Sequence, residues 1–112
     1  MTLRLLLTVL AAVAAIAVTL SAASAADPKA GRKKAAVCKT CHGIDGIAEI
    51  PIAPHIAGES QIYLATQLKA FRSGKRQHEI MSIIAGQLSD EDIFDISAWY
   101  SSITFTATMP AE

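Results

Sequence analysis

The sequence has little that would cross-link the chain, charge it strongly or build a sheet. Only two cysteines, Cys38 and Cys41, occur among its 112 residues. Because two residues separate them, a disulfide between them would close a very small loop and tie no distant segments together. The formal net charge is zero, so no overall charge favours nucleic acid as a partner. No alternating apolar pattern predicts a strand, and no internal repeat is visible. These absences leave one small helical domain as the expectation.

The first 26 residues, MTLRLLLTVLAAVAAIAVTLSAASAA, differ from the rest of the chain. They carry one positive charge at Arg4, no acidic residue, a long apolar run and a patch of small residues. This order predicts a secretory signal peptide over 1–25, cleaved after Ala25 or, as second choice, after Ala26. Retention as an N-terminal membrane anchor is the alternative, although the run is shorter than the ~20 residues of a typical span. The remainder, 26–112, is expected to form one domain. A domain of this size often needs a disulfide, a metal or a bound cofactor to stabilise its core.

The rest of the chain predicts an all-α domain of about four helices. Alanine, lysine and arginine dominate the stretch before the cysteines and favour helix, and Asp27 and Pro28 suit its start. Ser89 followed by three acidic residues is typical of a capped helix start. Glycine and proline concentrate in 43–59, which predicts a loop. We expect helices from Pro28 into the cysteine motif, over 60–74, for one or two turns within 81–87, and from Ser89 to about Thr104.

The stretch VCKTCHG is compatible with three kinds of chemistry, because its two cysteines are followed directly by His42. A thiol–disulfide redox pair normally occurs in a βαβ context, which this pattern does not offer. A structural zinc site needs four ligands, and beyond the motif only His55 and His78 are candidates to complete it. Cys-x-x-Cys-His is also the signature for covalent attachment of haem c. The helical pattern and the expected export favour this third interpretation, in which Cys38 and Cys41 tether the haem and His42 is the proximal iron ligand.

Four segments, in order along the chain, resemble the class I c-type cytochromes. Within that family the chain is most similar to the small bacterial branch that includes the domains of two-haem cytochromes. The segments are AGRKKAAVCKTCHG, PHIAGES, YLATQLKAFRSGKR and M…LSDEDI…AWY, and they cover nearly all of 26–112. The resemblance implies a small cytochrome c-like fold wrapped around one covalently bound haem c. It also implies an electron carrier and not an enzyme.

The family usually supplies a methionine sulfur as the second axial ligand of the iron. By resemblance this residue is Met81, which precedes the last helix, whereas Met109 lies in a C-terminal tail with little to hold it. His55 and His78 are the alternatives, and ligation by two histidines would lower the reduction potential. The expected metal ligands are therefore His42 and Met81.

The resemblance also implies roles for residues around the haem. The carbonyl of Pro54 is expected to accept a hydrogen bond from the ring of the proximal histidine, which orients the imidazole and raises its basicity. Gly31 is expected to let the first and last helices cross closely, with Trp99 and Tyr100 packed beside it. The expected walls of the haem pocket are Tyr63, Leu64, Leu68, Phe71, Ile83 and Ile93.

These assignments predict a periplasmic single-haem cytochrome c that carries one electron at a time between larger redox proteins. A haem-bearing subunit of a dehydrogenase or oxidase complex is the alternative, followed by a peroxidase or gas sensor with an open sixth site. We expect no nucleic-acid partner and no stable membrane span after leader cleavage. Basic residues cluster at 29–39 and 69–76 and acidic ones at 90–95, an arrangement that would make the domain dipolar. The alternative is that these charges only form solvated helix faces. Lys39 should lie beside the exposed haem edge, where a basic rim would favour redox partners with acidic surfaces.

Overall fold

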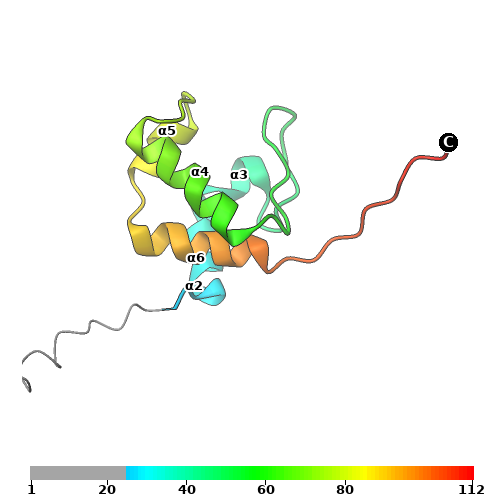
Figure 1. Cartoon of the computed structure of the whole chain (residues 1–112), viewed down its shortest axis with the longest axis horizontal. Coiled ribbons are helices and arrows are strands. Elements are labelled where there is room, and N and C mark those ends of the chain that lie inside the picture. The colour runs from blue at the N-terminus through cyan, green and yellow to red at the C-terminus, as the bar shows by residue number, and fades with distance from the viewer. Residues whose placement is uncertain (1–24) are drawn as a thin grey trace, which may run out of the picture.

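A computed structural model describes residues 25–112, which fold as helices joined by loops (Figure 1). The signal peptide expected over 1–25 lies almost entirely outside these residues. Helix α2 packs against α6, and α4 packs against both α5 and α6. The elements are α2 (Pro28–Lys34), the 3₁₀-helix η1 (Ala35–Val37), α3 (Lys39–His42), α4 (Gln61–Ser73), α5 (Met81–Gly86) and α6 (Asp90–Ser101). No strand occurs within the described part of the chain, which confirms the all-α prediction.

The helix boundaries follow the capping residues that the sequence indicates. The Ser60 hydroxyl accepts a hydrogen bond from the Tyr63 amide at 3.1 Å, and Gly74 closes α4 with a left-handed φ of 80°. Ser89 and Asp92 form a complete capping box at the start of α6. Such caps satisfy amides and carbonyls that a helix end would leave unpaired. The predicted starts of the later helices and the end of α4 are therefore confirmed, whereas α6 ends at Ser101, before the expected Thr104.

The first expected helix is three short pieces instead of one. Helix α2 gives way to η1 after Lys34, and α3 begins only after Cys38. The tighter 3₁₀ turn rotates the cysteine motif relative to α2. The prediction of a single continuous helix into the motif is wrong in this detail, although the backbone remains helical almost throughout.

Helices α2 and α6 cross at very short range. A Cβ atom at Gly31 would overlap the main-chain carbonyl of Asp95, and it would lie 3.0 Å from the Cβ of Trp99. Only glycine allows the two backbones to approach this closely. The expected role of Gly31 at the helix crossing is consistent with this contact.

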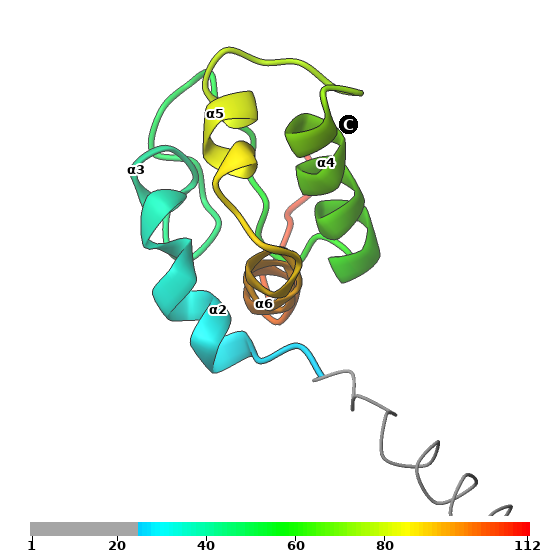
Figure 2. The same cartoon turned by 90° about the vertical axis from the view of Figure 1, so that its left-hand side faces the viewer.

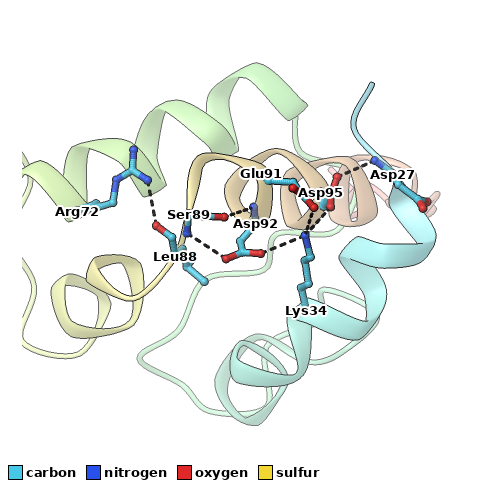
Figure 3. A network of polar contacts seen from close by, with 8 residues as sticks. All are labelled: Asp27, Lys34, Arg72, Leu88, Ser89, Glu91, Asp92 and Asp95. Carbon is cyan, nitrogen blue, oxygen red and sulfur yellow. Dashed lines mark hydrogen bonds and ion pairs between the residues drawn. The ribbon is translucent and has the colours of Figure 1, made fainter. Parts of the chain in front are cut away.

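An ion-pair network fastens α2 to the start of α6 (Figure 3). The ammonium of Lys34 lies 2.8 Å from Asp95, 3.0 Å from Glu91 and 3.1 Å from Asp92. The other carboxylate oxygen of Asp95 accepts a hydrogen bond from the Asp27 amide at 2.8 Å. The Lys34 contact, followed by the Asp27 amide, holds the pKa of Asp95 below its ordinary value, and the same carboxylates raise the pKa of Lys34. Asp95 is only 4% exposed and is thus a buried charge with complete partners.

The core lies between α6 and the elements on either side of it. Ala35, Leu64, Ile96 and Tyr100 form its centre, and Ile93 is fully buried. Ile103 still packs against the core, and the tail after it extends away from the helices without further secondary structure (Figure 1). Among residues 25–112, no helix is both long and apolar enough to cross a membrane.

Candidate functional site

A cavity of about 630 Å³ opens between the cysteine motif and α4, α5 and α6. Figure 2 shows α3 on one side, α4 on the other, α5 above and α6 viewed nearly end-on beneath them. The lining is mainly aliphatic and aromatic. From the cysteine motif it takes Val37, Cys38, Thr40, Cys41 and His42; from the following loop Ile50, Ile52, Ala53, Pro54, His55, Ile56 and Glu59; and from α4 onward Tyr63, Leu64, Gln67, Leu68, Phe71, Arg76, His78, Ile80, Met81, Ile84, Ile96, Ser97 and Tyr100.

Cys38 and Cys41 both line this cavity as half-buried free thiols. The turn between them, with the Cys41 amide bonded to the Cys38 carbonyl at 3.3 Å, places both sulfurs on one wall. Burial, with a smaller contribution from Cys41, raises the pKa of the Cys38 thiol to about 11. A thiol that stays protonated at neutral pH is a poor nucleophile for disulfide exchange. The environment of Cys38 therefore does not favour its attack on a disulfide.

His42 is 9% exposed and is oriented by the loop that follows it. Its Nδ1 lies 2.9 Å from the carbonyl oxygen of Pro54. A carbonyl can only accept, so Nδ1 donates the hydrogen of this bond, and in the neutral imidazole Nε2 is the nitrogen that carries the free lone pair. An imidazole in this state can ligate a metal through Nε2 while its other nitrogen is fixed by the backbone.

The loop over 43–58 folds back on itself to bring Pro54 to His42. Gly43 ends α3 with a φ of 73°, a conformation that L-residues rarely adopt. The carbonyl of Gly46 then accepts hydrogen bonds from the amides of Ile56 at 2.8 Å and Ala57 at 3.1 Å. These bonds close the loop and set the position of the Pro54 carbonyl.

Helix α6 supports the same loop through two consecutive side chains. The Tyr100 hydroxyl donates to the Gly43 carbonyl at 2.9 Å, and the Trp99 indole donates to the Ile44 carbonyl at 2.8 Å. Burial raises the pKa of Tyr100, so its hydroxyl remains protonated and able to donate. Sequence reasoning assigned both aromatics to packing alone, and it missed these hydrogen bonds because each joins residues more than 50 positions apart.

Met81 is the first residue of α5 and lines the cavity together with His42. Met109 is 84% exposed in the tail and does not line it. His55 and His78 also border the cavity, and each accepts backbone hydrogen bonds at Nδ1. The donors are Ala48 at 2.8 Å for His55, and Ile80 at 3.2 Å and Met81 at 3.3 Å for His78. The two histidines thus have local structural roles at the loop and at the start of α5.

Two of the six expected wall residues do not line the cavity. Tyr63, Leu64, Leu68 and Phe71 line it, but Ile83 is 64% exposed and Ile93 is buried elsewhere in the core. Ile84 and Ile96 occupy the wall positions instead. In α5 the error is one of helical phase, since the adjacent Ile83 and Ile84 point in different directions and only packing decides which one faces inward. In α6, Ile93 and Ile96 share one face, and only Ile96 lies at the level of the cavity.

The residues around the cavity fit a haem c. Two sulfurs and an imidazole lie on one wall, a thioether lies in the same cavity, and the remaining lining is largely apolar. Ser97 also lines the cavity, and among the described residues its fully buried hydroxyl has no hydrogen-bond partner. Within residues 25–112, no three His, Cys, Asp or Glu side chains are placed to hold a free metal ion. The donor set thus suits an iron held in a macrocycle better than a four-ligand zinc site.

The charges are less separated than the sequence suggests. Lys34 pairs with three carboxylates of α6, and Lys69 and Arg72 pair with Asp90. The expected dipole between basic and acidic clusters is therefore weakened by direct pairing across helices. Lys39 remains exposed within the cysteine motif.

Comparison with known proteins agrees with this architecture. The family model for cytochrome c matches residues 28–104. Cytochrome c-554(548) of Halomonas halodenitrificans is 46% identical over 81 residues, covering 70% of this chain and 98% of that protein. Cytochrome c4 of Pseudomonas aeruginosa is 42% identical, covering 70% of this chain and 39% of that protein.

A solved structure is also similar. The crystal structure of reduced recombinant cytochrome c4 from Pseudomonas stutzeri superimposes with a TM-score of 0.67 at 37% identity, covering 71% of this chain and 47% of that one. This chain thus spans less than half of the two cytochromes c4 but almost the whole of the Halomonas protein. Since the family model covers most of the chain, the protein belongs to the cytochrome c family.

Proposed function

We propose that this protein is a single-haem, one-electron carrier whose iron is ligated by His42 and Met81. The observation that carries the proposal is that both residues line one apolar cavity, with the Nδ1 of His42 held 2.9 Å from the Pro54 carbonyl. Cys38 and Cys41 tether the haem on the His42 side. When bound, the haem supplies an iron that alternates between Fe(III) and Fe(II).

The residues around the cavity would hold and orient the ligands of the iron when haem is bound. The Pro54 carbonyl keeps the hydrogen of His42 on Nδ1, so that Nε2 stays available and basic. With haem bound, Met81 would be the second protein ligand of the iron, and no coordination position would then remain for a substrate. Leu64, Leu68 and Phe71 exclude water, and the low polarity that results favours the less charged ferrous state. We therefore propose a carrier without catalytic activity of its own.

Electrons would enter and leave at the edge of the cysteine motif. Lys39 is exposed there, between the two tethers. A positive charge at this point would steer partners that present acidic surfaces. The proposed partners are redox proteins of this kind, and no nucleic acid is among them.

The proposed location is the periplasm. The leader over 1–25 carries the proposal, because a charged, apolar and small-residue order directs secretion. Intact-mass analysis of the protein from a host that assembles c-type cytochromes tests it. Cleavage after Ala25 or Ala26 supports export, whereas a retained leader in the membrane fraction would indicate an anchored protein.

A visible spectrum of the purified holoprotein tests the ligand assignment. A low-spin ferric spectrum with the long-wavelength charge-transfer band of methionine ligation is expected. Met81→Ala should abolish this band, and Met109→Ala, a matched change in the exposed tail, should leave it intact. A high-spin ferric wild type would overturn the carrier and favour a peroxidase or sensor. Loss of the band in M109A and not in M81A would overturn Met81 as ligand.

A further inference from the structure

The structure assigns Tyr100 and Trp99 of α6 as positioning residues that set the geometry between His42 and Pro54. This inference rests on the proposed function, since it concerns how strongly His42 donates to the haem iron. It departs from the expectation that the two aromatics serve packing alone.

The side chains of Trp99 and Tyr100 donate hydrogen bonds to two consecutive backbone carbonyls directly after His42, the proposed ligand. Gly43 and Ile44 follow His42 in the chain, and their carbonyls accept from Tyr100 at 2.9 Å and Trp99 at 2.8 Å. Both contacts restrain the backbone that carries the imidazole. The Tyr100 contact is buried, so breaking it would leave the Gly43 carbonyl with only the longer hydrogen bond from the Gly46 amide, at 3.3 Å.

Tyr100 also holds the other end of the same loop. Its main-chain carbonyl accepts a hydrogen bond from the Gly58 amide at 2.9 Å. One residue of a rigid helix therefore anchors 43 and 58, the two ends of the segment that contains Pro54. The His42–Pro54 distance depends on both ends, because His42 immediately precedes the loop and Pro54 lies within it.

A change in this geometry has a defined electronic consequence. The bond from Nδ1–H to a carbonyl makes the imidazole a stronger donor, which favours Fe(III). If the bond lengthens, the imidazole becomes a weaker donor, the ferrous state becomes more stable relative to the ferric state, and the reduction potential rises. General loosening that admits water to the cavity has the opposite effect, because water stabilises the more charged ferric site. The sign of the shift therefore separates positioning from a merely structural role.

The experiment compares holoprotein variants by potentiometric titration. Tyr100→Phe removes only the hydroxyl, and Trp99→Phe removes the indole donor on the neighbouring carbonyl. We expect each to raise the ferrous-to-ferric ratio about twofold to tenfold at the wild-type midpoint, where tenfold corresponds to 59 mV for one electron. In the diamagnetic ferrous protein, the Nδ1–H of His42 should exchange with solvent at least about tenfold faster by NMR, because a weaker bond opens more often.

Asp95→Asn is the matched control, since it weakens the contact of α2 with α6 without touching the loop over 43–58. It should lower stability while leaving the potential and the His42 exchange rate unchanged. A falling or unchanged potential in Y100F and W99F, or the same shift in D95N, would overturn the inference. If Y100F does not fold, W99F alone decides. A wild type without low-spin haem would instead overturn the proposed function, so the two failures are distinguishable.

Discussion

Gly31 of α2 and Asp95 of α6 are in direct main-chain contact: the carbonyl of Asp95 fills the space that a side chain at Gly31 would take. The contact brings the two helices close enough for the side chain of Lys34 to reach the acidic first turn and Asp95 of α6. Backbone contacts and side-chain ion pairs therefore both connect α2 to α6.

Gly31→Ala should destabilise the protein by about 3 kcal/mol or more, because a backbone carbonyl cannot move aside as a side chain can. Denaturant unfolding of the holoprotein measures the loss. Gly86→Ala is the matched control: a Cβ there meets no atom within 4 Å. It should change stability by less than about 1 kcal/mol. Equal losses in both variants would contradict the close crossing.

Stability should fall in acid through the carboxylates of α6. The pKa values of Asp90, Asp92 and Asp95 all lie below the ordinary value of 3.8. The largest cause is the hydrogen bond from Lys34 for Asp95, that from the Ser89 backbone for Asp92, and that from Arg72 for Asp90. The unfolded chain therefore binds protons first as the pH falls. Their contribution is complete above the ordinary carboxyl pKa and is lost as the pH falls through the lower folded values.

Asp95 should dominate this acid effect, since Asp90 is exposed and ion pairs in solvent contribute little. Asp95→Asn should lower stability at neutral pH by about 1–3 kcal/mol. It should also make the stability of the protein depend less on pH in the acid range. Unfolding midpoints measured from about pH 7 to about pH 2.5 check both effects. A variant curve parallel to the wild type would show that Asp95 does not carry the dependence.

The exposed charge of Lys39 should set the rate of reaction with small charged oxidants. Lys39→Glu should slow oxidation of the ferrous protein by anionic ferricyanide about twofold to tenfold at low salt, and speed oxidation by cationic tris(phenanthroline)cobalt(III). Added salt should shrink both effects. Stopped-flow kinetics measure them.

Lys29→Glu is the control for this measurement, because it makes the same charge change at an exposed position of α2, outside the cysteine motif. Equal slowing by both variants would indicate an effect of net charge alone. Electron transfer would then have no preferred entry at the cysteine motif.

Local signals made much of the fold predictable. Ser60, Gly74 and Ser89 cap their helices through contacts within a few residues, so sequence spacing alone is sufficient to identify them. Prediction failed where rotation about a helix axis decides the outcome. Ile83 and Ile84 are adjacent and equally apolar, and packing of α5 against α4 turns the second toward the cavity. The pairing of Lys34 with α6 was missed because its partners lie 57 to 61 residues away.

The sequence by itself determined the cysteine–histidine motif, the helix ends and the glycine-rich loop, since each depends on neighbouring residues and on backbone preferences. Only the tertiary structure decided which apolar residues face the cavity, which charges neutralise one another, and that α6 holds the loop between His42 and Pro54. These features join residues far apart in the chain, so their formation depends on how the helices pack. Trp99 and Tyr100 therefore look like core residues in the sequence but become donors to the backbone beside His42 once α6 is in place.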